Sequence, residues 1–92
     1  MKIKYINRLS RFKRAYKHLS DNIKDDFDEK IIIFIKDPKD SRLRVHKLKG
    51  KLQECLAFCL RDGFRVLFEL SSRDAINLLD VGSHDKYKLW KK

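Results

Sequence analysis

The chain has 92 residues, 42% of them hydrophobic, which supports one small core, so we expect a single domain over residues 1–92. Its 23 lysine and arginine residues outnumber 13 acidic ones and give a net charge of +10 at pH 7, which favours a polyanionic partner such as nucleic acid. The apolar runs argue against disorder but fall far short of the roughly 20 residues that cross a bilayer. With no signal-peptide hydrophobic region at its start, a soluble, cytoplasmic protein without a membrane partner is expected.

The chain opens with the pattern of a short strand and a basic helix. Polar and apolar side chains alternate over residues 2–6, as in a half-buried strand. From Leu9 to Leu19 the apolar residues recur every three or four positions, which predicts a helix with Asn7 or Ser10 as its N-cap. A second row on this helix is cationic and is expected to be solvated; it consists of Arg8, Arg11, Arg14 and Lys17.

A second helix follows and completes a helical hairpin. Ser20 and Asp21 provide a cap, and apolar residues keep a helical period from Ile23 to Ile35. The helix is expected to end before Pro38, because proline disfavours helical geometry in the residue that precedes it. Its acidic residues suit the positive end of the helix dipole and are interpreted as solvated surface rather than catalytic carboxylates; they are Asp25, Asp26, Asp28 and Glu29.

The second half of the chain has the pattern of a sheet. After a polar turn, residues 43–50 favour extended structure, and the apolar runs that predict strands lie over residues 55–60, 64–70 and 75–81. An Asp62–Gly63 turn joins the first two runs into a hairpin, and residues 82–85 break the last one. The order β-α-α-β-β-β predicts an α+β fold, with the helical hairpin packed on one face of a mostly antiparallel four-stranded sheet.

The two cysteines are interpreted as buried structural thiols. If the segment around Cys55 and Cys59 is a strand, the two thiols lie about 13 Å apart on one face, beyond the reach of a disulfide. Their spacing is not Cys-x-x-Cys, and no histidine pairs with them in a zinc-finger pattern, so no metal site is predicted.

Three stretches together resemble the RelE/ParE superfamily of toxin-antitoxin toxins. They are Leu43-x-x-His46-Lys47-Leu48-Lys49-Gly50, the sequence Gly-Phe-Arg-Val-Leu-Phe-Glu at residues 63–69, and Leu-Asp-Val-Gly-Ser-His-Asp-Lys-Tyr-Lys at residues 79–88. The resemblance covers nearly the whole chain and is closest to RelE- and YafQ-like mRNA interferases, which share the His-x-Leu-x-Gly stretch, an arginine in the third strand and a Gly-Ser/Thr-His ending. It implies a compact microbial RNase fold, ribosome-dependent cleavage of mRNA without a metal or cofactor, and a hetero-oligomeric complex with a cognate antitoxin.

Two residues of these stretches carry the chemistry that RNA cleavage requires. Without a metal ion, the reaction needs a proton acceptor, a proton donor and a cation for the charge on the phosphoryl oxygens. Imidazole exchanges protons near neutral pH, and His84, on a loop just beyond the fourth strand, is the candidate for the main proton-transfer residue. The resemblance assigns Arg65 to the phosphate, which a planar guanidinium matches in shape. The alternative for Arg65 is a structural ion pair with Asp80 or Glu69.

Two further residues of the same stretches are candidates for the site. His46 matches the histidine of the family's His-x-Leu-x-Gly stretch, and it is either a second proton-transfer group or a surface residue. Tyr87 stacks on a base or donates its hydroxyl to a phosphate, or else it anchors the C-terminal tail on the core. His18 has no motif around it and is interpreted as ordinary helix surface.

Basic residues around the hairpin and the tail either contact RNA backbone or serve only solubility; they are Lys47, Lys49, Lys51, Arg61, Lys86 and Lys88. The chain departs from the family pattern in its second strand, where many active relatives carry basic residues and residues 56–60 are apolar. Two alternatives therefore stay open. One is a ParE-like poison of DNA gyrase, against which His84 argues, and the other is a non-catalytic member that only binds an antitoxin.

Overall fold

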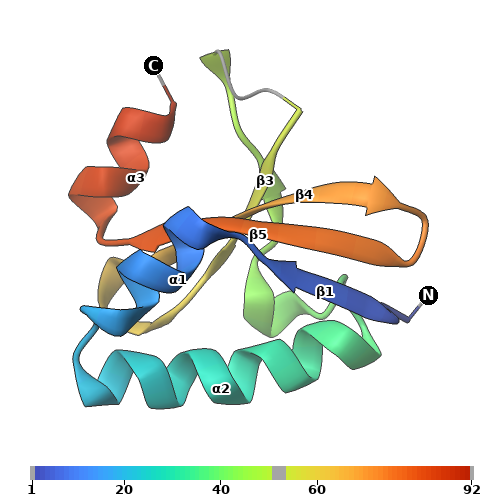
Figure 1. Ribbon diagram of the computed structural model, residues 1–92, viewed down its shortest axis with the longest axis horizontal. Coiled ribbons are helices and arrows are strands. Elements are labelled where there is room, and N and C mark those ends of the chain that lie inside the picture. Colours follow the sequence, from blue (N-terminus) through green and yellow to red (C-terminus); the bar gives the residue numbers. More distant parts are fainter. Residues whose placement is uncertain (1, 51–53, 92) are drawn as a thin grey trace.

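The computed structural model describes residues 2–50 and 54–91, and within them the chain forms a five-stranded sheet with helices on both faces (Figure 1). The strand order is β1-β5-β4-β3-β2, with β1 parallel to β5 and the other neighbours antiparallel. The elements are β1 (Tyr5–Arg8), α1 (Ser10–Lys17), α2 (Asp21–Lys36), the 3-10 turn η1 (Ser41–Leu43), β2 (His46–Lys47), β3 (Leu56–Cys59), the 3-10 turn η3 (Arg61–Gly63), β4 (Arg65–Ser72), β5 (Ala75–Gly82) and α3 (His84–Trp90).

The predicted α+β fold is confirmed, but the predicted number of strands is wrong. Helices α1 and α2 form the expected hairpin on one face of a mostly antiparallel sheet (Figure 1). The fifth strand is β2, whose two residues pair with β3 through His46 opposite Ala57 and Lys47 opposite Leu56. The sequence pattern favours extended structure over residues 43–50, and the pairing with β3 makes His46–Lys47 the part of that segment that forms a strand.

The first helix begins differently from the prediction. Leu9 is the N-cap of α1, not Asn7 or Ser10, and its backbone N–H donates to the carbonyl of Leu78 at 3.1 Å. Asn7 instead belongs to β1, where its side-chain amide donates to Asn77 of β5 at 3.0 Å. Pairing with β5 therefore holds the chain extended through Asn7 and moves the start of the helix past it.

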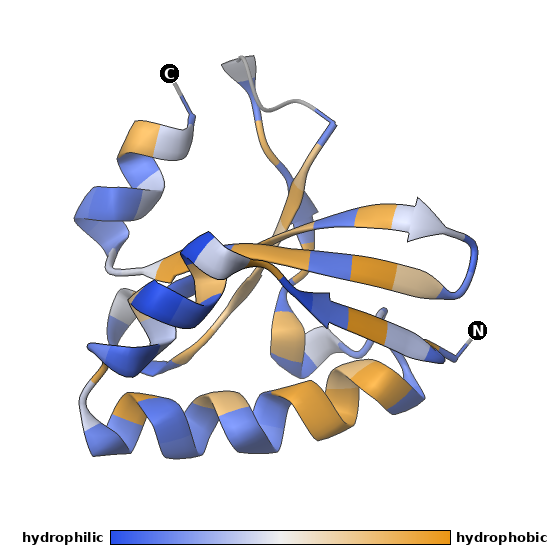
Figure 2. Cartoon of the chain, viewed as in Figure 1, coloured by the Kyte–Doolittle hydropathy of each residue, from blue (hydrophilic) through white to orange (hydrophobic). Residues whose placement is uncertain are grey.

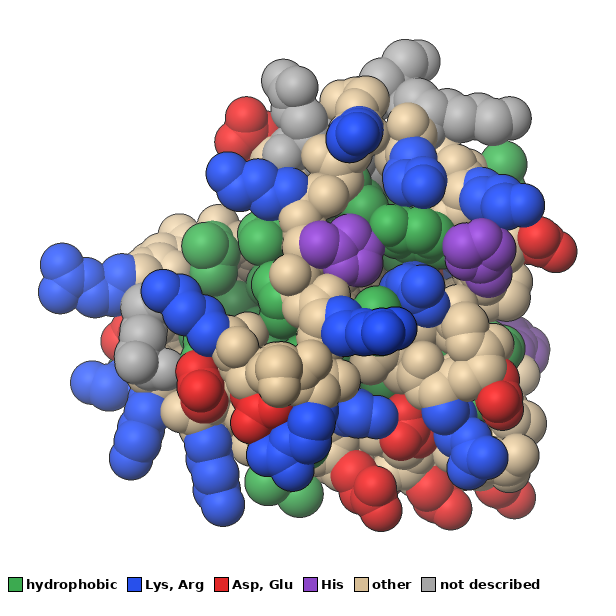
Figure 3. Space-filling view, turned by 180° about the vertical axis from the view of Figure 1, so that it is seen from behind, with side chains coloured by type: hydrophobic (Ala, Val, Ile, Leu, Met, Phe, Trp, Pro, Cys, Tyr) green, Lys and Arg blue, Asp and Glu red, His purple; other side chains and the backbone are tan. Residues whose placement is uncertain are grey.

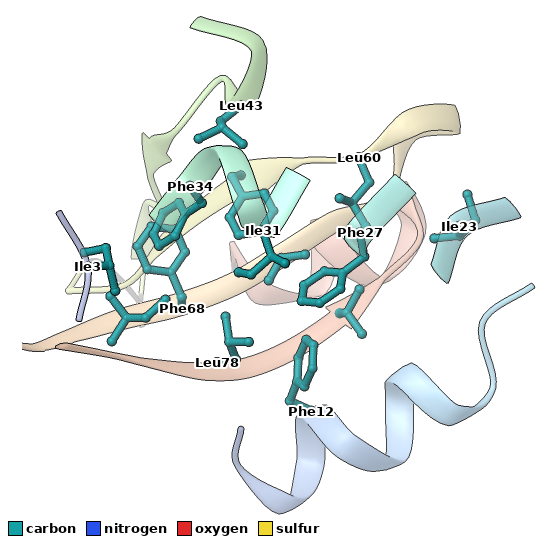
Figure 4. Packing of buried hydrophobic residues seen from close by; sticks show 14 residues of the cluster. Ile3, Phe12, Ile23, Phe27, Ile31, Phe34, Leu43, Leu60, Phe68 and Leu78 are labelled. Carbon is teal, nitrogen blue, oxygen red and sulfur yellow. The ribbon is translucent and has the colours of Figure 1, made fainter. Parts of the chain in front are cut away.

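The main core lies between the helical hairpin and the sheet. The second helix ends at Lys36, before Pro38 as predicted, and its buried residues belong to the main core cluster. Figure 2 shows hydrophobic residues along α2 and in the strands above it. The ring of Phe34 lies 5.2 Å from that of Phe58 on β3 and 5.0 Å from that of Phe68 on β4 (Figure 4). Aromatic contacts of this kind bury large apolar areas and dominate the stability of a small core.

The opposite face of the sheet is covered by α3, which the sequence pattern does not predict. Its helix is short but capped, because the Ser83 hydroxyl accepts a hydrogen bond from the backbone N–H of Lys86 at 3.4 Å. A side chain at Gly82 would collide with Lys86, so glycine at this position lets the helix approach the strand. A second, smaller apolar cluster lies under α3 and consists of Leu48, Cys55, Ala57, Leu67, Tyr87 and Trp90. None of the described helices combines the length and the apolar character needed to cross a bilayer.

Candidate active site

The four sequence-predicted site residues meet on the α3 face of the sheet. The ring of Tyr87 lies at their centre, with its centroid 5.7 Å from the His46 ring and 5.8 Å from the His84 ring. The guanidinium carbon of Arg65 lies 5.1 Å from the same centroid. Since His46 comes from β2, Arg65 from β4 and the other two from α3, only the folded chain assembles this group.

Figure 3 views the molecule from behind, and it shows histidine side chains on either side of hydrophobic ones, among many lysine and arginine side chains. Tyr87 itself is buried, with 8% of its surface exposed, and it packs in an edge-to-face contact with Trp90 at 6.1 Å. Tyr87 therefore anchors α3 on the sheet. Its ring also contacts the side chains of the two histidines and Arg65.

The hydrogen bonds of His46 define its tautomer. Its Nδ1 lies 2.8 Å from the backbone carbonyl of Arg44, and its Nε2 lies 2.8 Å from the hydroxyl of Tyr87. A carbonyl only accepts, so Nδ1 carries the hydrogen and a neutral imidazole then accepts the Tyr87 O–H at Nε2. When His46 takes up a proton, the same contact reverses and Nε2 donates to the tyrosine oxygen. The two residues form a linked pair through which a proton can move.

Arg65 begins β4 and has no acidic partner among the described residues. Its Nη1 donates to the carbonyl of Phe64 at 3.2 Å, and its Nε is buried without a hydrogen-bond partner. The alternative of an ion pair with Asp80 or Glu69 is wrong, since both carboxylates bind other donors; Glu69 accepts from the amide of Asn77 at 2.9 Å. A permanent positive charge without a carboxylate is costly to bury and remains available to an anionic ligand.

His84 is held on a helix rather than on the expected loop. It is the first residue of α3, and its ring is exposed. A Cβ at Gly63, the last residue of η3, would lie 3.5 Å from the Cβ of His84, so the η3 turn runs beside the helix start. Tyr87 lies three residues after His84, so the two side chains lie on the same face of α3, and the helix backbone fixes their relative positions.

The predicted RNA-contacting cations fall into three groups. Lys47, Lys49 and Lys88 are exposed, and Arg61 is exposed with its Nε 3.5 Å from the Asp62 carboxylate. The ammonium of Lys86 instead bonds a buried carboxylate, that of Asp80, at 2.7 Å. Lys51 lies outside the described residues.

Two residues of this region have positions that the sequence did not predict. The Nζ of Lys91 lies 4.9 Å from the centroid of the Tyr87 ring and adds a second cation to the site. Asp80 is fully buried beneath α3. The signal for Lys91 was its spacing: His84, Tyr87 and Lys91 follow one another at intervals of three and four residues, which marks one face of a helix that begins after Ser83.

The arrangement suits the chemistry of a phosphate ester. Two cations, from Arg65 and Lys91, lie at the ring of Tyr87, beside two imidazoles and one hydroxyl. Within residues 2–50 and 54–91, no carboxylate forms an ion pair with these cations or imidazoles. The site can therefore attract an anion, stabilise added negative charge and exchange protons, which are the requirements of phosphoryl transfer.

No family model matches the sequence, and no curated protein matches it. Solved structures do match. A double mutant of the E. coli toxin RelE in the free state has a TM-score of 0.70 at 15% identity over 98% of this chain and 92% of its own. An archaeal RelE–RelB complex from Pyrococcus horikoshii has a TM-score of 0.70 at 20% identity over 91% of this chain and 97% of the other. A copper-bound point mutant of a Helicobacter pylori toxin has a TM-score of 0.65 at 22% identity, covering 94% and 98%.

These likenesses cover nearly the full length of both chains in each case. The chain therefore has the fold of the RelE/ParE toxins, as the sequence resemblance implied. At these identities the likeness describes the backbone arrangement, and the chemistry has to be argued from the chain's own residues.

Proposed function

We propose that this chain is the toxin of a type II toxin-antitoxin system, a single cytoplasmic domain over residues 1–92 that cleaves mRNA on the ribosome. The observation that carries the proposal is the convergence of His46, Arg65 and His84 around Tyr87, because these residues come from three separate sequence motifs and meet only in the folded chain. An antitoxin that covers or rearranges this site is the expected protein partner.

The proposed reaction is an attack within the RNA chain. A base removes the proton of a ribose 2′-hydroxyl, the 2′-oxygen bonds to the adjacent phosphorus, and the bond from phosphorus to the 5′-oxygen breaks. The departing 5′-oxygen takes a proton from an acid, so the products are a 2′,3′-cyclic phosphate and a 5′-hydroxyl. Exposed His84 supplies one of these proton transfers, and the Tyr87–His46 pair supplies the other.

Arg65 and the surrounding lysines have different parts in this scheme. The guanidinium of Arg65, which has no carboxylate partner, would bind the phosphoryl oxygens as charge builds on them. Exposed Lys47, Lys49 and Lys88 would bind neighbouring backbone phosphates, which adds affinity without sequence preference and makes binding weaker as salt increases.

The test is cleavage of mRNA on programmed ribosomes by the purified protein. We expect His84→Ala and Arg65→Ala each to lower the single-turnover rate by about 10² to 10⁴-fold while the protein stays folded. His18→Ala is the matched control, because this exposed histidine at the end of α1 lies in no motif, and it should cut at the wild-type rate. Full activity in His84→Ala would remove the proposal.

Two parallel assays separate the remaining alternatives. Inhibition of DNA supercoiling by gyrase, with mRNA left intact, would replace the nuclease by a gyrase poison. Harmless expression in cells, together with tight antitoxin binding, would replace it by a non-catalytic binding module. Growth arrest that requires His84 supports the nuclease.

A further inference from the structure

We infer that Asp80 is a positioning residue that holds α3, and through it Tyr87 and His84, in register with Arg65. The inference deepens the proposed function and rests on it for its catalytic consequence. Its structural part is that one buried carboxylate determines the position of α3. That part can be tested without a nuclease assay.

The side chain of Asp80 is fully buried, and both of its oxygens are saturated with donors. Oδ1 accepts from the ammonium of Lys86 at 2.7 Å and from the backbone N–H of Val81 at 2.9 Å. Oδ2 accepts from the indole N–H of Trp90 at 3.2 Å and lies 3.1 Å from the Nε of Arg11. Two donors thus come from α3, one from α1 and one from β5 itself.

The two α3 donors lie four residues apart, so the carboxylate bonds two successive turns of one helix face. Tyr87 sits between them in the sequence, and His84 lies two residues before Lys86. Bonds on both turns determine the rotation of the helix about its axis as well as its height above the sheet. Both quantities decide where the Tyr87 hydroxyl and the His84 imidazole point.

The helix depends on this attachment because it is short. Its seven residues are below the length at which an isolated helix is stable in water, so tertiary contacts must supply its stability. The apolar cluster under α3 is the smaller of the two clusters in the described part of the chain. Without Asp80 the buried indole N–H of Trp90 would lose its acceptor, and the ammonium of Lys86 would keep only the carbonyl of Val81, at 3.2 Å. An unpaired buried donor and a lost ion pair both favour movement of the helix toward water.

The rest of the fold does not depend on Asp80 in the same way. Its neighbours Leu78 and Val81 belong to the core cluster on the opposite face of the sheet. The donor from α1, Arg11, has a side chain that is 66% exposed, and α1 packs on the core through buried Phe12. Loss of the carboxylate should therefore release α3 and leave the packing of α1, α2 and the strands in place.

The experiment compares Asp80→Ala and Asp80→Asn with Asp40→Ala. Asp40 is the matched control, since it is a carboxylate whose oxygen lies 2.8 Å from an arginine, Arg42, in the η1 region away from α3. Trp90 is the single tryptophan of the chain, so its fluorescence reports the environment of α3 directly. Nitrogen NMR of His46 reports whether Tyr87 still bonds Nε2, and single-turnover cleavage gives rate and KM separately.

In Asp80→Ala we expect red-shifted Trp90 emission, a His46 Nε2 signal that shows loss of the Tyr87 hydrogen bond, and a cleavage rate lowered by about 10²-fold, with KM changed much less. Asp80→Asn keeps one acceptor oxygen and should lie between Asp80→Ala and the wild type. Asp40→Ala should keep the wild-type emission, His46 signals and cleavage rate.

Wild-type emission and His46 signals in Asp80→Ala would overturn the inference, as would a released helix with an unchanged cleavage rate. If Asp80→Ala does not fold, Lys86→Met and Asp80→Asn decide the question. In these two variants, a red shift of the Trp90 emission and a change in the His46 signals, each smaller than expected for Asp80→Ala, would support the inference. Wild-type spectra in both variants would refute it. A wild-type protein that cuts no mRNA contradicts the proposed function instead, and the emission and NMR comparison still decides the role of Asp80 in holding α3.

Discussion

The hydroxyl of Tyr87 lies 2.8 Å from Nε2 of His46, although 41 positions separate the two residues along the chain. This hydrogen bond joins the edge strand β2 to the C-terminal helix across the face of the sheet. Together with the carbonyl of Arg44 on Nδ1, it holds the imidazole in one orientation. It therefore has a structural role and, in the proposed reaction, provides a path for a proton.

Replacement of Tyr87 by phenylalanine separates these two roles. The ring packing against Trp90 remains, so the free energy of unfolding should fall by only about 1 kcal/mol, the net value of one hydrogen bond. Nε2 of His46 should then lose its hydrogen bond, which moves its nitrogen NMR signal, and the cleavage rate should fall by at least about tenfold. An unchanged Nε2 signal in Tyr87→Phe would contradict the hydrogen bond between the two residues.

Arg65→Met should separate stability from activity. Methionine keeps much of the apolar contact with the Tyr87 ring and removes a buried Nε that has no acceptor. We expect a free energy of unfolding within about 1 kcal/mol of the wild type, or above it, and a cleavage rate lowered by about 10²-fold or more. Urea titration and ribosome cleavage measure the two quantities. A loss of stability above about 2 kcal/mol would contradict the absence of a structural partner for Arg65.

Asp40 should contribute an acid-sensitive part of the stability. Hydrogen bonds from the side chain and backbone of Arg42 lower the pKa of its carboxyl from 3.8 to about 2. Because the folded chain then binds fewer protons than the unfolded chain, this contribution is complete above about pH 4 and is lost as the pH falls through about 2. Urea unfolding of the wild type and Asp40→Asn from pH 2 to 6 should give a difference that is constant at the upper end and shrinks toward the lower end. A difference that does not vary with pH would refute the assignment.

The two cysteines should differ in reactivity. Both thiols are free, and burial raises the pKa of Cys55, which favours its protonated, unreactive form. Cys59 is less buried, with its Sγ 4.0 Å from the carbonyl of Arg44. Under a limiting amount of iodoacetamide at pH 8, mass spectrometry should find Cys59 modified first. Equal labelling would mean that Cys55 becomes exposed readily in the native state.

Phe34→Ala should test the helix-to-sheet core. Phe34 is fully buried between Phe58 and Phe68, and its truncation should lower the free energy of unfolding by about 3 to 5 kcal/mol. Ile32 on the outer face of the same helix is 56% exposed, so Ile32→Ala should change it by less than about 0.5 kcal/mol. Similar losses in both variants, measured by thermal unfolding, would argue against the packing of α2 on the sheet.

Local sequence patterns were sufficient to predict the elements whose own residues show a helical or strand pattern. The three-and-four spacing of apolar residues and Pro38 placed α2 correctly, and the runs around Asp62–Gly63 placed β3 and β4. Each of these patterns lies within one element and follows from which face is buried. The motifs also selected Tyr87 and the three residues His46, Arg65 and His84 that surround it.

The elements that the pattern missed depend on contacts between distant segments. Residues 43–50 were predicted to be extended, but only the pairing with β3 makes His46–Lys47 the strand β2. The helix α3 packs through Tyr87 and Trp90 on strands that precede it in the chain. In the same way, the sequence does not distinguish Lys86 from the surface lysines. Only the folded chain places its ammonium against the carboxylate of Asp80.

The amino-acid sequence by itself therefore determined the α+β architecture, the helical hairpin and the identity of the imidazoles and guanidinium available for chemistry. Only the tertiary structure decided that Arg65 has no carboxylate partner, that Tyr87 bonds His46 and that Asp80 lies buried under α3. The reason is physical: the burial and pairing of a polar group depend on which residues fold around it, and those residues lie far away along the chain.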